Sequence, residues 1–158
     1  MVKIYSSHQV LYSRLQKYCS YQERCQQDVE KKLRDLKASS SDANQIIIDL
    51  IQENFLKEER YARSFVRGKF KMNHWGKNKI IQNLRRKNIS ENLIDLALKE
   101  IDPDEYRSMI KILLQKKWDS LQMEDLSLQL HKVIQHVIQK GFEPSFALEI
   151  SKQLFKTS

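Results

Sequence analysis

IIQNLRRKNI at residues 80–89 aligns without gaps on VIQHVIQKGF at residues 133–142, and this internal repeat decides the fold. Apolar residues coincide at the first, second, fifth and last positions, a spacing that is typical of one face of an amphipathic helix. Asn88 coincides with Gly141, and these two residue types best tolerate the left-handed backbone conformation that ends many helices. The alignment therefore predicts two equivalent helices, each followed by a left-handed residue.

The same spacing extends outward along nearly the whole chain of 158 residues. Only three glycines and two prolines are present, so the sequence has few turn formers for a β-rich fold. Nine helices are predicted, over residues 8–19, 24–37, 42–54, 57–72, 76–87, 90–101, 103–118, 123–140 and 143–156.

Several predicted helices begin at recognisable capping residues. Asp42, with Gln45 three residues later, is predicted to cap the third helix, and the preceding run 38–41 is predicted to be a loop. Ser90 is well placed to cap the sixth helix. Asp102 stands before a proline, which suits the first helical position because it has no N–H to lose, so the seventh helix is predicted to begin there.

A period of about 50 residues with three helices in each unit predicts side-by-side units that cover one another's apolar faces. The expected fold is all-α, with three tandem three-helix repeats forming an elongated, curved array. The predicted boundaries are 1–56 for the first repeat, 57–101 for the second and 102–158 for the third.

The net charge of +8 is concentrated in the second repeat. Residues 1–56 carry eight basic and seven acidic side chains, and residues 103–158 carry the same numbers. Between them, one segment of the second repeat contains no Asp or Glu. Its basic residues are Arg60, Arg63, Arg67, Lys69, Lys71, Lys77, Lys79, Arg85, Arg86 and Lys87. Such a segment can neutralise several phosphates, so these ten residues are the candidate partner-binding or nucleic-acid-binding site. The alternative interpretation is a set of solvated helix faces.

Three further residues are candidate partner contacts, each with a structural alternative. Glu58 and Glu59 lie in the first turn of a predicted helix, where negative charge offsets the helix dipole, so capping alone can explain them. Trp75 lies at a turn between two helices, where it can anchor the packing or offer a stacking platform for bases.

The second repeat resembles the central motif of the bacterial RecX regulatory proteins. The residues that carry the resemblance are LKEERYARSFVR at 56–67, WGKNKI at 75–80 and LRRKNI at 84–89. Asn88 stands where that family usually has Gly, and the first and third repeats resemble it only loosely. The resemblance implies three three-helix repeats, binding to the RecA recombinase filament on single-stranded DNA, and inhibition of its strand exchange, ATP hydrolysis and coprotease activities.

Other functional classes find little support. The sequence has no Gly-rich phosphate loop, nucleophile elbow or HExxH motif, so neither an enzyme nor a cofactor is expected. Cys19 and Cys25 match neither a redox pair nor a zinc site, and the spacing of the four histidines indicates no metal. The amino terminus lacks the apolar core of a signal peptide, and no segment is apolar enough to span a membrane. A cytoplasmic protein without membrane contact is therefore expected, and we expect a monomer.

Three hypotheses remain for the function. The first is a non-enzymatic negative regulator that docks on the RecA filament and reaches single-stranded DNA through it. The second is an autonomous nucleic-acid-binding helical-repeat protein that acts without RecA. The third is a structural adaptor for an acidic protein, on which DNA would have no effect.

Overall fold

The computed structural model describes residues 7–156, and within this range the chain forms nine α-helices and no β-strand. The helices are α1 (Ser7–Tyr21), α2 (Gln26–Asp35), α3 (Ser40–Gln52), α4 (Glu58–Lys71), α5 (Lys77–Arg86), α6 (Glu91–Leu98), α7 (Pro103–Asp119), α8 (Leu126–Gln139) and α9 (Pro144–Phe155). The described residues do not include 1–6 and 157–158. Most of the amino-terminal segment that lacks the apolar core of a signal peptide therefore lies outside them.

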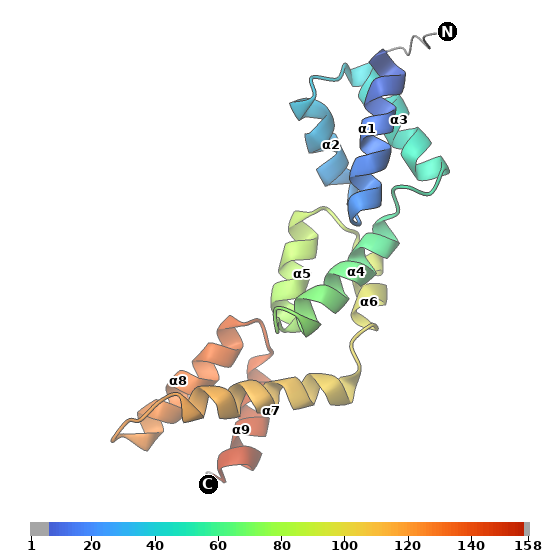
Figure 1. Cartoon of the computed structure of the whole chain (residues 1–158). Helices are drawn as coiled ribbons and strands as arrows, with labels where there is room; N and C mark the ends of the chain where they lie inside the picture. Colours follow the sequence, from blue (N-terminus) through green and yellow to red (C-terminus); the bar gives the residue numbers. More distant parts are fainter. Residues whose placement is uncertain (1–6, 157–158) are drawn as a thin grey trace.

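The helices pack as three consecutive triplets. Extensive contacts join α1, α2 and α3, then α4, α5 and α6, and finally α7, α8 and α9. The triplets follow one another along an elongated molecule, with the first and third triplets at opposite ends (Figure 1). This confirms the all-α fold of three tandem three-helix repeats in an elongated, curved array. The repeat boundaries proposed after residues 56 and 101 fall in the connections before α4 and α7.

The second helix of every triplet ends in the same way. Asn88 and Gly141 have the predicted left-handed conformation, with φ of 59° and 100°, and Lys37 has it at the end of α2, with φ of 56°. In each case the next N–H donates to a carbonyl five residues earlier, which satisfies a carbonyl that the helix leaves free. These bonds are Ala38 N to Leu33 O, Ile89 N to Leu84 O, and Phe142 N to Val137 O.

Two of the three predicted helix caps are confirmed. The side chains of Ser90 and Asp102 accept backbone N–H groups of the helices that follow them. The predicted cap at Asp42 is wrong, because the hydroxyl of Ser39 accepts the Asp42 N–H at 3.1 Å and the helix already begins at Ser40. Asp42 lies instead in the first turn, and the run 38–41 is only partly a loop.

The start of α8 also differs from its prediction, by three residues. Residues 120–125 form a connection that the buried side chain of Gln129 stabilises. Its Oε1 accepts the N–H of Met123, and its Nε2 donates to the carbonyls of Trp118 and Leu121. These bonds satisfy backbone groups of the connection and of the last turn of α7, so the chain joins the helix only at Leu126.

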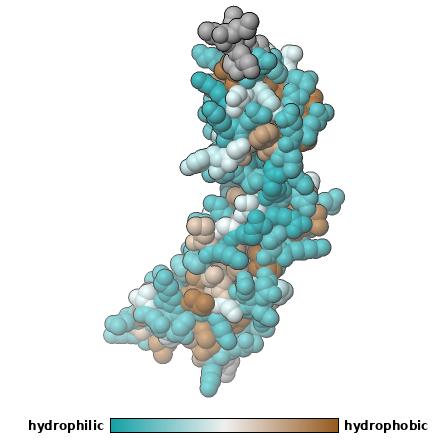
Figure 2. All heavy atoms as spheres, turned by 45° about the vertical axis from the view of Figure 1, so that its right-hand side comes forward, coloured by the Kyte–Doolittle hydropathy of each residue, from teal (hydrophilic) through white to brown (hydrophobic). Residues whose placement is uncertain are grey.

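Two apolar cores stabilise the array. One fills the first triplet around Leu15, Val29 and Ile46, and the other runs continuously through the second and third triplets. Complete burial of a Leu, Ile or Val side chain contributes roughly 1.5–3 kcal/mol. Cys25, at the start of α2, belongs to the second core, so the first triplet inserts a side chain into its neighbour. Hydrophilic side chains cover most of the face seen in Figure 2.

Candidate partner-binding surface of the middle unit

The ten candidate basic residues lie on α4, on α5 and at the residue that ends α5. They fall into three groups by what they contact. Ion pairs hold Arg60, Arg63, Arg67, Arg85 and Lys87. Aromatic rings lie under Lys69, Lys77 and Lys79. Within residues 7–156, Lys71 and Arg86 have no acidic side chain at ion-pair distance.

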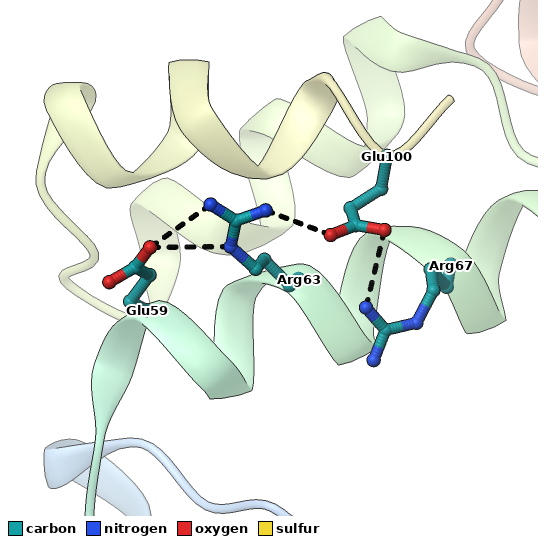
Figure 3. A network of polar contacts seen from close by, with 4 residues as sticks. All are labelled: Glu59, Arg63, Arg67 and Glu100. Carbon is teal, nitrogen blue, oxygen red and sulfur yellow. Dashed lines mark hydrogen bonds and ion pairs between the residues drawn. The ribbon is translucent and has the colours of Figure 1, made fainter. Parts of the chain in front are cut away.

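Arg63 and Arg67 belong to a network with two glutamates, shown in Figure 3. The Arg63 guanidinium bonds Glu100 at 2.9 Å and Glu59 at 3.0 Å, and Arg67 reaches the other oxygen of Glu100 at 3.3 Å. The hydrogen bond from Arg63 is the main cause that lowers the pKa of Glu100. Two positive and two negative groups balance, so this part of α4 is less positive than its sequence indicates.

Arg60 and Lys87 join the middle triplet to the first. Arg60 Nε lies 2.6 Å from Glu23 Oε1, and its Nη2 also donates to the carbonyls of Asn54 and Phe55. Lys87 Nζ lies 2.8 Å from Asp28 Oδ1. Both cations therefore hold the junction between triplets, although Arg60 still lines one shallow hollow with Arg63 and Arg67, which follow it at helical spacing on α4. Lys71 does not line that hollow.

Glu58 and Glu59 occupy the first turn of α4 and are both engaged within the chain. Glu59 binds Arg63, and Glu58 Oε1 accepts the N–H of Gln26 from the first triplet at 3.2 Å. Burial is the main cause that raises the pKa of Glu58. Their contact with a partner stays a prediction.

Trp75 is half-buried, and the side chains of two lysines lie over its ring. Its ring meets Phe65 edge to face, with 6.4 Å between centroids. Lys69 Nζ lies 4.9 Å and Lys79 Nζ 4.5 Å from the centroid of the Trp75 ring. Neither ammonium group has an acidic partner among the described residues. The ring of Trp75 therefore packs on the core beside two half-buried lysines, and its use as a stacking platform for bases stays a prediction.

The amino end of α5 is fixed to the third triplet through its backbone. Gly76 N–H donates to the carbonyl of Lys140 at 2.8 Å, and Asn78 N–H donates to that of Gly141 at 2.9 Å. The N–H of Lys77 donates to the hydroxyl of Tyr106 at 3.1 Å, and that hydroxyl in turn donates to Glu143. These bonds position Lys77 with its Nζ 4.8 Å from the Tyr106 ring centroid.

Sequence reasoning missed the acidic partners of the basic residues. Glu23, Asp28 and Glu100 lie outside the acid-free segment, at separations of 37, 59 and 37 residues from Arg60, Lys87 and Arg63. No local pattern reveals such pairs, because they form only once helices that are distant in the sequence pack together.

The described part of the chain contains no metal-binding cluster and no disulfide. No group of three or more His, Cys, Asp or Glu side chains there could hold a metal ion. Cys19 and Cys25 are free, and burial raises the pKa of each thiol to about 11. None of the described helices combines the length and the apolar character that a membrane span needs.

A family model of the second three-helix domain of RecX matches residues 58–98, which cover α4, α5 and α6. Among characterised proteins, the regulatory protein RecX of Limosilactobacillus reuteri is 32% identical over 134 residues, which make up 85% of this chain and 51% of that protein. RecX of Clostridioides difficile is 32% identical over 117 residues, or 72% of this chain and 55% of that protein. The chain thus spans about half the length of the relatives that it matches.

Solved structures agree with the sequence relatives. The crystal structure of RecX from Lactobacillus salivarius superposes with a TM-score of 0.84 and 26% identity, over 95% of this chain and 97% of that one. A second crystal structure of a regulatory protein RecX gives a TM-score of 0.82 and 27% identity, over 95% of this chain and 81% of that one. Similarity therefore extends over all three triplets.

Proposed function

Because this chain belongs to the RecX family, whose members above are named regulatory proteins, we propose that it binds the RecA filament on single-stranded DNA and inhibits the filament's strand exchange, ATP hydrolysis and coprotease activities. It does so as a cytoplasmic monomer, without catalysis and without a cofactor. The partner follows from what the family resemblance implies.

The observation that carries the proposal is the pair of lysines at Trp75. Lys69 and Lys79 present ammonium groups at one aromatic ring, whereas the arginines of α4 are largely neutralised within the chain. Unpaired cations beside an aromatic ring suit exposed phosphates and bases, or an acidic protein surface. We place the main partner contact of the middle triplet at Lys69, Trp75 and Lys79, with Lys71, Lys77 and Arg86 adding to the field.

The elongated array suggests how docking produces regulation. Three triplets in a row can contact more than one subunit of a helical filament (Figure 1). A ligand shifts a conformational equilibrium only by its differential affinity for the two states. Docking that favours an inactive subunit arrangement therefore lowers ATP turnover.

The test measures ATP turnover and filament length of RecA on single-stranded DNA while the purified protein is added. We expect inhibition by the wild type and weaker inhibition by the double variant Lys69→Gln/Lys79→Gln. The control is Lys111→Gln/Lys132→Gln, which removes the same charge from exposed positions of the third triplet. Unchanged turnover and filament length at saturating protein would overturn the proposal.

The second candidate, an autonomous nucleic-acid-binding protein, uses the same lysines. It requires tight binding to bare DNA or RNA, with a salt dependence that falls when Lys69 and Lys79 are neutralised. Filament-directed action instead requires weak binding to bare DNA and a strong dependence on RecA. An adaptor for an acidic protein would act identically with and without DNA.

A further inference from the structure

The first triplet has a second basic surface, although its numbers of basic and acidic side chains are nearly equal. Positive side chains gather on one face, between α1 and α2, in a shallow open hollow whose lining contains no acidic residue. The lining residues are Arg14, Lys17, Tyr18, Tyr21, Arg24, Lys32 and Leu36.

Helical periodicity explains the gathering. Arg14, Lys17, Tyr18 and Tyr21 stand at positions i, i+3, i+4 and i+7 of α1, so they share one face of that helix. Lys32 brings a further cation from α2. The composition of the repeat gives no sign of this face, because equal numbers of charges can be distributed unequally around a helix.

Two aromatic rings, those of Tyr18 and Tyr21, line this hollow beside its basic side chains. Arg24 Cζ lies 3.8 Å from the centroid of Tyr18, and Arg24 Nε donates to the Tyr18 carbonyl at 3.0 Å. Lys32 Nζ lies 5.5 Å from the same centroid. Tyr21, in contrast, is 84% exposed at the end of α1 and has no ring contact among the described residues. An exposed aromatic ring beside cations is the arrangement that proteins use to stack bases while they neutralise the backbone.

The hollow continues toward the middle triplet. Arg24 also lines a neighbouring hollow together with Lys69 and Lys87. The acids of that second hollow are Glu23 and Asp28, and both are neutralised by ion pairs. Lys69 in turn lies beside Trp75, so one basic and aromatic path runs from Tyr21 through Arg24 to Trp75.

We propose that the first triplet binds single-stranded nucleic acid directly, with a base stacked on Tyr21 and the phosphates contacted by Arg14, Lys17 and Lys32. The path through Arg24 leads the strand toward Lys69 and Trp75. This site goes beyond the proposed regulation, because it concerns direct contact of the first triplet with the strand, which gives weak binding to bare strand in addition to the contacts with RecA.

Fluorescence anisotropy of a labelled oligodeoxythymidine, measured over a range of salt concentrations without recombinase, tests the site. Removing two phosphate contacts with Lys17→Gln/Lys32→Gln lowers the slope of log affinity against log salt by about 1.4, at about 0.7 for each contact. The control Lys31→Gln/Arg34→Gln carries the same charge change on α2 outside the hollow and leaves most of that slope intact.

Substitutions of Tyr21 test base stacking without changing the charge of the hollow. Because a stacked base contributes about a fivefold to 150-fold change in affinity, Tyr21→Ala is expected to weaken binding by at least about fivefold, and Tyr21→Phe is expected to restore it. A side chain this exposed can be replaced without unfolding the triplet, and circular dichroism verifies this. Equal losses from the hollow and control pairs, unchanged binding in Tyr21→Ala, or equal affinity for duplex DNA would each overturn the proposal. RecA inhibition is scored separately, so failure of this site leaves the proposed regulation to its own test.

Discussion

Lys87 Nζ and Asp28 Oδ1 lie 2.8 Å apart, and their ion pair joins the end of α5 to the first turn of α2. Asp28 is the more enclosed partner, with 18% of its side chain exposed against 39% for Lys87. The same carboxylate accepts the N–H of Cys25 at 3.2 Å, and Cys25 is buried in the core of the neighbouring triplet. This pair therefore stabilises the contact between the first and second triplets.

Replacement of Lys87 is expected to destabilise this junction. Lys87→Met keeps most of the aliphatic stem but leaves the Asp28 carboxylate without its cation, so the free energy of unfolding should fall by about 1 kcal/mol. Urea denaturation followed by circular dichroism measures the change. Arg85→Met is the control, because the Arg85–Glu91 pair lies at the surface with 58% and 60% exposure and should leave the midpoint unchanged. Equal midpoints for Lys87→Met and the wild type would contradict the role of the pair.

The contribution of the same pair should depend on pH. Burial would raise the pKa of Asp28, but the hydrogen bonds from Lys87 and Cys25 outweigh it and lower the pKa below its ordinary value of 3.8. The hydrogen bond to Asp28 raises the pKa of Lys87 above 10.5. A lowered carboxyl pKa stabilises the fold above the unfolded value and loses this effect as the pH falls through the folded value. A raised lysine pKa stabilises the fold below 10.5 and loses the effect as the pH rises through the folded value.

The stability difference between the wild type and Lys87→Met should thus be constant across neutral pH and should shrink once the pH falls below 3.8. Denaturation curves of both proteins at neutral and at acidic pH supply the comparison. A difference that persists unchanged after Asp28 is protonated would show that the ion pair is not how Lys87 stabilises the junction.

Gly76 and Gly141 should not tolerate a side chain. A Cβ at Gly76 would meet the backbone N of Phe142 at 2.2 Å, and a Cβ at Gly141 would meet the Cβ of Lys79 at 2.4 Å. Gly141 also has φ of 100°, where an L side chain is strained. We expect Gly76→Ala and Gly141→Ala each to destabilise the contact between α5 and α8 by about 2–3 kcal/mol or more, because backbone must move to relieve the overlap.

Gly68 supplies the matched control for these substitutions. It lies inside α4, and a Cβ added there would meet no atom of another element within 4 Å, so Gly68→Ala should stabilise the helix by about 0.5–1 kcal/mol. Thermal unfolding of the three variants ranks them directly. Three equal shifts in the midpoint would show that the close backbone approach does not limit stability.

Local signals in the sequence were sufficient for the helices and the repeat. Asn88 and Gly141 were predicted to end equivalent helices because a left-handed residue and the apolar spacing before it are both local properties. The cap of α3 was placed wrongly because Ser39 and Asp42 are both good capping residues three positions apart. Only the backbone conformation distinguishes them.

The partner-binding surface was predictable only in part. The acid-free segment identified the cations, but Glu23 and Glu100 neutralise Arg60 and Arg63 from 37 residues away. Likewise, the repeat containing Tyr21 has balanced charge, and its basic face emerges only when α1 and α2 pack together. Sequence composition counts charges, whereas function depends on which of them remain unpaired after folding.

Removal of Glu100 should increase the positive field of the middle triplet. Its two oxygens bind Arg63 at 2.9 Å and Arg67 at 3.3 Å, so Glu100→Gln leaves Arg67 without a carboxylate and Arg63 with Glu59 alone. The freed charges should strengthen binding to an anionic partner at low salt, and screening should remove the gain at high salt. We therefore expect less protein to be needed for half-maximal inhibition of RecA ATP turnover.

The control for this gain is Glu149→Gln, which makes the same charge change and frees Arg107 from its 2.7 Å ion pair in the third triplet. Inhibition by Glu100→Gln should improve several-fold at low salt, while Glu149→Gln should remain close to the wild type. Equal improvement of both variants would mean that net charge alone governs binding. No improvement in Glu100→Gln would mean that Arg63 and Arg67 do not face the partner, which would leave the lysines at Trp75 as the contact of the middle triplet.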